Sequence, residues 1–241
     1  MTVKIAPQNF EVTVHNIRDL GNETKHFELF YDPGKTMDFI PGQFVSVYYP
    51  HPGGKIVRRA YSIASSPNVK NHFDLCLKLI PTGTVTPWFW NFNEGERFKV
   101  QGPLGKFILP DTIDFDIVFV ATGTGLAPFR SMIQTLLPAG FKRKIGLIFG
   151  VRYDNAIPYH EEWLALEKQY PNFTYIPTIS RPSSEWKGET GYVQTKIEKF
   201  FPDAAGKQVY ICGLNDMIQA VLDACLKVGF PKEKVIFERY D

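Results

Sequence analysis

The hydrophobic pattern of this 241-residue chain changes type near its middle, and that change constrains the fold more than any other feature. Up to about residue 108, short segments rich in Val, Phe and Tyr are separated by Pro/Gly turns such as those at 32–35 and 50–54. Six such segments with hardly any helix predict a small antiparallel barrel. The segments are 11–17, 26–30, 43–49, 59–64, 73–80 and 97–102. One short helix is expected with Pro87 at its first position, where a missing N–H costs nothing.

From about residue 115 the pattern becomes near-continuous apolar runs, as strands buried on both faces require. Helical stretches alternate with these runs, which predicts a doubly wound parallel sheet with right-handed crossovers. The fold class is therefore β plus α/β: a six-stranded antiparallel β-barrel over 1–110, then a parallel-sheet α/β domain over 111–241. The expected strands are 114–121, 144–151, 173–180 and 207–213, and the expected helices are 128–137, 159–170, 192–201 and 217–228.

Composition narrows the function classes. A net charge of +2 gives no case for nucleic acid as the main partner. Three dispersed cysteines without a CxxC spacing cannot assemble an iron–sulfur or zinc site, so no metal is expected. No apolar run approaches a membrane span of about 18 residues, and we expect a cytoplasmic protein with no membrane contact. Basic clusters at 55–59 and 142–144 are suited to steering a small acidic partner.

Several short motifs occur in a fixed order along the chain, and each alone is weak. The first half contains FIPGQFVSV (39–47), RRAYSIASSP (58–67), KLIPTGTVTPW (78–88) and VQGPLGKFILP (100–110). The second half contains FVATGTGLAPFRSM (119–132), YICGLNDM (210–217) and VIFERYD (235–241). Over residues 8–241 this ordered set resembles the ferredoxin–NADP(+) reductase family, in its bacterial type without a fused iron–sulfur domain. Members pair an FAD-binding barrel with a nicotinamide-nucleotide domain.

The resemblance implies a flavin site in the barrel. In the Arg-x-Tyr-Ser motif, Arg59 would pair with the flavin pyrophosphate, Tyr61 would lie against the ring, and Ser62 would offer its hydroxyl near flavin N5. Strand alternation puts Ser62 on the opposite side from Arg59 and Tyr61, so a bulge or a strand end is expected here. A second phosphate grip would include Thr86, standing before Pro87 at a helix N-terminus. The implied FAD-binding residues are Arg59, Ala60, Tyr61, Ser62, Gly83, Val85 and Thr86.

The resemblance also implies a nucleotide site in the second half. The family's GTGxAP form would turn backbone N–H groups toward the pyrophosphate, with Pro128 starting a helix. The Ser-Arg pair at 180–181 resembles relatives that use NADP, whereas the W-x-G-x-x-G-Y-V tail is shared with NADH-type reductases, so NADP is favoured and NAD is the alternative. The implied residues are Thr122, Gly123, Thr124, Gly125, Pro128, Ser180, Arg181, Lys187, Tyr192, Gln194, Cys212 and Gly213.

The implied catalytic residues are Ser62, Cys212, Glu238 and Tyr240. Tyr240 would stack on the flavin face that the nicotinamide must occupy and would swing away before hydride transfer. Because Asp241 follows Tyr240, where bacterial relatives often carry Trp, Phe237 stays open as the ring partner. The resemblance thus implies a monomer that exchanges a hydride between NADP(H) and FAD, and single electrons with a ferredoxin or flavodoxin.

Three alternatives remain. One is an NADH-dependent reductase component of an oxygenase that uses a separate ferredoxin, since the cysteines leave no fused cluster. Another is a free-flavin reductase, which would not need the phosphate grips. The last is a flavin-binding electron-transfer subunit that is inactive alone.

Overall fold

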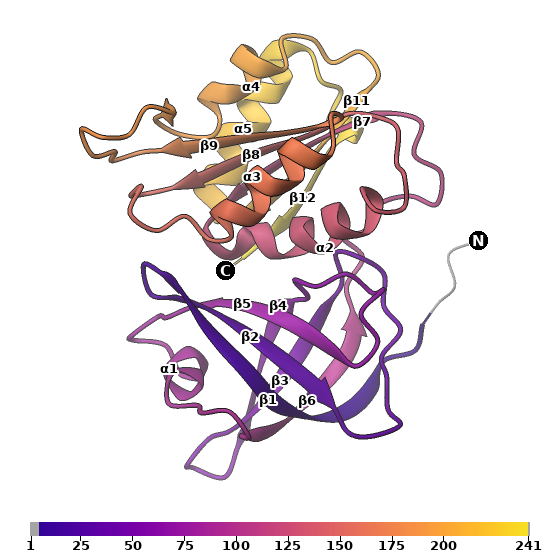
Figure 1. Ribbon diagram of the computed structural model, residues 1–241, viewed down its shortest axis with the longest axis vertical. Helices are drawn as coiled ribbons and strands as arrows, with labels where there is room; N and C mark the ends of the chain where they lie inside the picture. The colour runs from indigo at the N-terminus through magenta and orange to yellow at the C-terminus, as the bar shows by residue number, and fades with distance from the viewer. Residues whose placement is uncertain (1–4, 241) are drawn as a thin grey trace. The chain divides into compact units, whose positions relative to one another are not determined.

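The computed structural model describes residues 5–240, which form two compact units (Figure 1). The first unit comprises the chain up to Asp111 together with Ala127–Ala139, and the second comprises Thr112–Leu126 and Gly140 onward. Helix α2 (Ala127–Leu136) is therefore grouped with the first unit by its contacts, although the chain runs through it between two strands of the second.

The first unit is the predicted antiparallel barrel. Its strand order is β4-β3-β6-β1-β2-β5, and the two outer strands meet through one bridge between Ile63 and Leu75. The N–H of Ala64 donates to the carbonyl of Asp74 at 2.8 Å beside that bridge. All six expected strands are confirmed: β1 (Gln8–Gly21), β2 (Thr24–Tyr31), β3 (Phe44–Pro50), β4 (Ile56–Ser62), β5 (His72–Lys78) and β6 (Arg97–Leu104).

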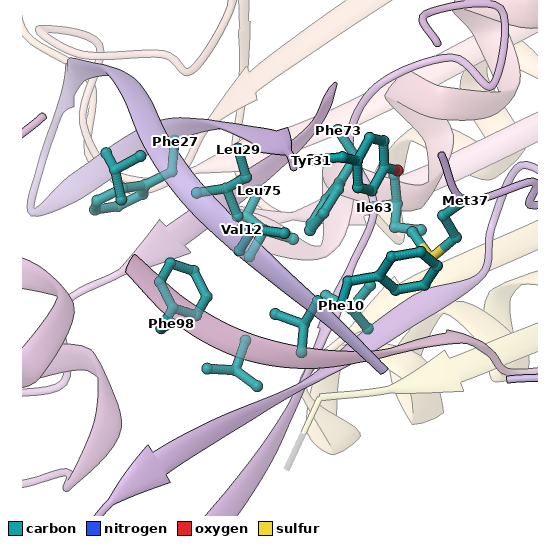
Figure 2. Packing of buried hydrophobic residues seen from close by; sticks show 14 of the residues in the cluster. Phe10, Val12, Phe27, Leu29, Tyr31, Met37, Ile63, Phe73, Leu75 and Phe98 are labelled. Atoms are coloured by element: carbon teal, nitrogen blue, oxygen red, sulfur yellow. The ribbon is translucent and has the colours of Figure 1, made fainter. Parts of the chain in front are cut away.

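Alternating apolar residues fill the barrel, as Figure 2 shows for side chains from β1, β2 and β5. Helix α1 (Val85–Trp90) adds Phe89, whose ring lies 5.3 Å from that of Phe27. The helix begins at Val85, so Pro87 stands at the third helical position and not at the first as predicted. The first four N–H groups of a helix have no partner within it, so proline is tolerated there as well.

The second unit is a parallel sheet in the order β10-β9-β8-β7-β11-β12. The four apolar strands are confirmed, and two edge strands, β10 and β12, were not predicted. The chain order reverses between β7 and β11, which makes the carboxyl ends of these two strands the topological switch point, where open α/β sheets bind ligands. The strands are β7 (Asp116–Thr122), β8 (Ile145–Val151), β9 (Phe173–Ile179), β10 (Glu189–Thr190), β11 (Lys207–Gly213) and β12 (Val235–Arg239).

Helices cover both faces of this sheet, which confirms the doubly wound arrangement. Ile197 of α4 (Thr195–Phe200) and Val221 of α5 (Asn215–Val228) pack in one cluster with Ile176 of β9. The ring of Trp163 in α3 (His160–Gln169) lies 6.2 Å from the ring of Tyr175, the residue before Ile176 in β9. Because neighbouring residues of a strand point to opposite faces, α3 covers the other face of the sheet. Within residues 5–240, none of the helices combines the length and apolarity needed to cross a membrane.

Candidate functional site

The Arg-x-Tyr-Ser motif lies on β4, at the end of the barrel's strand order. Among the described residues, β4 pairs along its length with β3 only, because the link to β5 comes after the strand, at Ile63. The backbone of 56–62 therefore presents unpaired donors and acceptors along its outer edge. Such an edge suits a flat ligand that hydrogen-bonds through its rim.

The side chains of this motif differ in exposure. Arg59 is exposed and donates one hydrogen bond, to the Arg58 carbonyl at 2.8 Å. Tyr61 packs edge-on to Phe89, with ring centroids 5.8 Å apart, and burial raises the pKa of its phenol to about 12, so it stays neutral. Ser62 is only 5% exposed and is the last residue of β4, which is the strand end that the alternation predicted.

The loop before α1 departs from the predicted phosphate grip. Thr86 does not precede the helix, because α1 already starts at Val85, and its hydroxyl oxygen accepts the N–H of Ile80 at 2.9 Å. Thr86 therefore closes the loop 80–86 and does not act as the helix cap. Gly83 lies in the same turn, where a Cβ would be 3.1 Å from the Ile80 oxygen. Val85 is buried in the barrel core, so the loop backbone is what this segment offers to a phosphate.

The TGTG stretch follows β7 as a short 3-10 turn, η1 (Gly123–Leu126). Helix α2 begins at Ala127, so Pro128 occupies its second position and not the first as predicted, because the 3-10 turn runs directly into the helix. Gly123 has a φ of +54°, and no atom lies within 4 Å of the position its Cβ would take. The turn therefore has open space above Gly123, as a cradle for a pyrophosphate requires. Thr122 and Thr124, half-buried, flank this glycine.

Cys212 lies at the carboxyl end of β11, beside β7 at the switch point. Its side chain is fully buried, and burial, with a smaller effect from the Glu238 carboxylate, raises the pKa of the thiol well above its usual value. The group is thus a neutral thiol near pH 7. The backbone N–H of Tyr240 donates to the Gly213 carbonyl at 3.0 Å, and the Tyr240 side chain slightly opposes the rise in the pKa of the Cys212 thiol. The structure thereby brings Cys212, Gly213, Glu238 and Tyr240 together.

The two aromatic candidates near the C-terminus lie on opposite faces of β12. Phe237 pairs in register with Ile211, which belongs to the apolar cluster covered by α4 and α5. Glu238 pairs with Cys212 on the other face, and Tyr240, two residues after Glu238 and bonded through its N–H to Gly213, follows the same alternation. Only Tyr240 therefore shares a face with Cys212.

The residues expected at the adenosine end lie where β8 and β9 finish. The N–H of Ser180 donates to the Val151 carbonyl at 3.1 Å, and the N–H of Arg181 donates to the Arg152 carbonyl at 2.8 Å. This pairing sets two exposed arginines side by side at one edge of the sheet. Arg152 was not predicted. It follows the buried strand β8 directly, and a cation just after a buried strand, as at Arg181 after β9, is the sequence signal that could have identified it.

The segment that follows Arg181 is held by its own contacts. The indole N–H of Trp186 donates to the Glu189 carbonyl at 2.9 Å, and the Lys187 ammonium donates to the Ser184 carbonyl at 3.3 Å. Tyr192 is 66% exposed, and Gln194 is half-buried just before α4.

Comparisons with known proteins agree with both halves. The family model described as an oxidoreductase FAD-binding domain matches residues 11–108, and that of an oxidoreductase NAD-binding domain matches residues 119–223. A ferredoxin–NADP reductase B from Sorangium cellulosum is 33% identical over 98% of this chain and all of its own. The phenol hydroxylase P5 protein of Acinetobacter pittii is 32% identical over 97% of this chain, which spans 66% of that relative.

Solved structures show the same fold. A cytochrome P450 reductase from Amycolatopsis superposes with a TM-score of 0.88 at 24% identity, over 97% of this chain and 70% of its own. A ferredoxin NADP+ reductase from Neisseria gonorrhoeae, solved with bound FAD and NADP, gives a TM-score of 0.82 at 18% identity, over 96% and 98% of the two chains.

Proposed function

This chain belongs to the ferredoxin–NADP(+) reductase family, in which an FAD-binding and an NAD-binding domain form one oxidoreductase, and we propose that it exchanges a hydride with NADP(H) and single electrons with a ferredoxin or flavodoxin. We assign the flavin site to residues 1–110 and the nucleotide site to 111–241. The observation that carries the proposal is the TGTG turn at the switch point of the sheet, in a chain whose barrel leaves the edge of β4 open.

The residues present fit both cofactors. Arg59 has an exposed guanidinium suited to phosphate oxygens, and Tyr61 offers a neutral ring beside it on the same strand. We assign the pyrophosphate to the open space above Gly123, at the turn that leads into α2. FAD, when bound, supplies a ring system able to take up two electrons together and to release them singly. In this proposal Ser62 directs its hydroxyl to the reactive nitrogen of that ring, and the Cys212 thiol lines the nicotinamide pocket.

NADP is favoured over NAD by the two arginines at the ends of β8 and β9. A 2′-phosphate adds negative charge to the adenosine end, and guanidinium groups bind phosphate through paired N–H donors. Arg152 and Arg181, joined through their backbones, present two such groups at one edge. The W-x-G-x-x-G-Y-V tail is accounted for by structure, because Gly188 makes room for the Trp186 ring and the indole closes on Glu189. We therefore give the Trp186–Glu189 part of this tail a structural role in the proposal and base the choice of nucleotide on the arginines.

Reduction of the holoprotein tests the hydride step. The purified protein is expected to carry tightly bound FAD, and NADPH is expected to reduce it faster than NADH in anaerobic stopped flow. Ser62→Ala should slow flavin reduction about 100-fold while FAD content stays the same, since placing a group for reaction is worth that much. The proposal is wrong if the protein is colourless and takes up no flavin on reconstitution. Flavin that dissociates as a product would instead identify a free-flavin reductase.

The one-electron partner is tested through the β3–β4 hairpin. Lys55, Arg58 and Arg59 are exposed there beside Ile56, which is 65% exposed, and Arg58 lies over the Tyr48 ring at 4.4 Å. We propose this basic hairpin as the surface that attracts an acidic carrier protein. The pair Lys55→Glu and Arg58→Glu should lower the ferredoxin reduction rate at low salt and leave flavin reduction by NADPH unchanged.

The pair Lys142→Glu and Lys144→Glu, in the other basic cluster, is the matched control for this hairpin because it changes the net charge by the same amount. Equal loss in both variants would mean that net charge alone steers the carrier. A ferredoxin reduction rate that neither variant changes would place the carrier elsewhere.

A second candidate function is the NADH-dependent reductase component of an oxygenase. It is favoured by the 32% identity to the phenol hydroxylase protein over nearly the whole chain. A higher kcat/KM with NADH than with NADPH, together with electron delivery to an oxygenase through a separate ferredoxin, would establish it.

A further inference from the structure

A buried arginine on α2 reaches the place where the barrel closes. Arg130 is 6% exposed, and its Nη1 donates to the Asp74 carboxylate at 2.9 Å and to the Ala64 carbonyl at 3.0 Å. A charged side chain is rarely buried to this degree without a specific partner. These two partners of Arg130 lie on opposite sides of the seam between β4 and β5.

That seam is thinly connected by backbone. Its backbone link is the bridge between Ile63 and Leu75, in which the Ala64 N–H donates to the Asp74 carbonyl at 2.8 Å. The Asp74 N–H also donates to the Ser65 hydroxyl across the seam at 2.9 Å. Arg130 adds a side-chain link, because it takes the Ala64 carbonyl on one side and the Asp74 carboxylate on the other. Ala64 comes two residues after Ser62, so this link fixes the segment on which the Ser62 hydroxyl is held.

The electrostatics make Arg130 the permanent partner of Asp74. His72 and His26 also approach this carboxylate, at 3.5 and 3.8 Å. Burial, followed by repulsion from Arg130, Arg18 and His72, lowers the pKa of His26 to about 3, so His26 is neutral near pH 7. Burial raises the pKa of Asp74 and the nearby Glu28 adds to that effect, while Arg130 opposes both by stabilising the charged form.

The helix that carries Arg130 is anchored along its length to the same unit. Thr135 and Ser66 share a hydrogen bond of 2.9 Å between their hydroxyls, and the rings of Phe129 and Phe107 lie 5.8 Å apart. In the chain, α2 starts at Ala127, directly after the TGTG turn ends. The helix that contacts the seam beside Ser62 is therefore the one that follows the proposed nucleotide turn in the chain.

We propose that Arg130 is a positioning residue, which holds the Ser62 segment across the barrel seam from the helix that begins at the nucleotide turn. The assignment rests on the proposed function only for the role of Ser62 in hydride transfer. Its structural part, that Arg130 controls the opening of the seam, stands without it.

Hydrogen exchange and flavin reduction on the FAD-loaded protein test the proposal together. In Arg130→Met, the Ala64 amide should exchange at least about 10-fold faster, since loss of a charged hydrogen bond is worth 1.4 kcal/mol or more. Flavin reduction should slow by about 10- to 100-fold because Ser62 is no longer held in place. FAD content and NADP+ affinity should stay within about twofold. Arg130→Lys, which keeps the charge, should recover most of both losses.

Arg97→Met is the matched control, because Arg97 pairs at 2.8 Å with Asp32 on the exposed surface of the barrel. It should change neither the Ala64 exchange rate nor flavin reduction. A second readout is the His26 ring in NMR: without Arg130, its pKa should rise as it takes over as the partner of Asp74. The flavin reduction rate of Arg130→Met should then become pH-dependent over the same range.

The proposal is overturned if the Ala64 amide of Arg130→Met exchanges at the same rate as in the wild-type protein. It is also overturned if exchange is faster but the flavin is reduced at the wild-type rate. If Arg130→Met fails to fold, Arg130→Met combined with Asp74→Leu removes the unpaired buried charge and takes its place in the test. If the wild-type protein shows no reduction by NADPH or NADH, the proposed function fails, and Ala64 exchange and the His26 titration still decide the role of Arg130 in the seam.

Discussion

Gly125 lies directly against the carbonyl of Cys212, so close that a Cβ on Gly125 would be 2.3 Å from the Cys212 oxygen. This contact joins the turn after β7 to the end of β11, the two strands that flank the switch point. Two glycines of one motif therefore have different tasks. Gly125 is required for packing, whereas Gly123 has open space above it and a φ of +54°.

These tasks predict opposite phenotypes for two alanine variants. Gly125→Ala would push the turn after β7 away from the backbone of Cys212. It should therefore lower the free energy of unfolding by about 3 kcal/mol or more. Gly123→Ala should cost only about 1 kcal/mol for its left-handed backbone, yet weaken NADP+ binding because the methyl group projects into the open space. Thermal unfolding and calorimetric titration of the same samples measure both quantities. Unchanged NADP+ affinity in a folded Gly123→Ala protein would remove the turn from the nucleotide site.

A second prediction concerns Tyr240, which follows β12 and lies on the same face of the sheet as Cys212 of β11. If its ring occupies the position that the nicotinamide needs, Tyr240→Ser should tighten binding of NADP+ to the FAD-loaded protein by about 10-fold or more, since the ring then no longer competes. Phe237→Ser is the control, because that side chain points to the opposite face and is 40% exposed. Difference spectra during titration with NADP+ report both affinities.

Tightening in Phe237→Ser but not in Tyr240→Ser would exchange the roles of the two rings. Equal affinity in all three proteins would mean that no C-terminal ring competes with the nicotinamide.

The fold was predictable because its two halves bury strands in two ways. The barrel strands β2, β3 and β6 alternate over most of their length, whereas the parallel strands β7, β8 and β11 are buried on both faces and read as continuous apolar runs. Edge strand β12 lacked that signal, because exposed residues interrupt its 235–239 segment. Its position was visible only as a motif of side chains near the C-terminus.

The parts of the site that were missed depend on contacts between distant segments. In the sequence, Thr86 before Pro87 is typical of a helix cap. In the structure its hydroxyl accepts the N–H of Ile80, across a turn that the sequence does not reveal. Arg130 lies in a predicted helix, where an arginine is usually solvent-exposed, and its partner Asp74 is 56 residues away. A motif indicates which residues belong to a site, and the tertiary contacts decide how each is used.

A third prediction tests the arginine pair at the adenosine end. Arg152→Ala and Arg181→Ala should each raise the KM for NADPH by about 10-fold and leave the KM for NADH unchanged, since a charged hydrogen bond to phosphate is worth 1.5–3 kcal/mol. The effect should shrink at high salt. Lys232→Ala is the control, because it removes an exposed cation that is not among the implied nucleotide residues. Equal losses with both nucleotides would assign the arginines to the shared part of the cofactor.

The last prediction follows from buried His26, whose pKa is lowered to about 3, chiefly by desolvation. Between pH 6.5 and about 3, His26 is protonated in the unfolded chain but neutral in the native state. The free energy of unfolding that comes from this difference is therefore full above pH 6.5 and is lost as the pH falls. From pH 6.5 to 5 this difference lowers the free energy of unfolding by about 2 kcal/mol. The raised pKa of Asp74 acts in the opposite direction, because the native state then takes up a proton more readily than the unfolded chain.

His26→Leu isolates the histidine contribution, because Arg130 and Asp74 remain in place. Urea unfolding at pH 6.5 and pH 5 should show a loss of stability that is smaller in the variant by about 2 kcal/mol. Replacement of exposed His51 by Gln controls for removal of a histidine as such. An identical loss in wild type and His26→Leu would mean that His26 takes up its proton in the native barrel over the same pH range as in the unfolded chain. Asp74 would then face two cations at low pH, and the seam would depend on pH already in the wild-type protein.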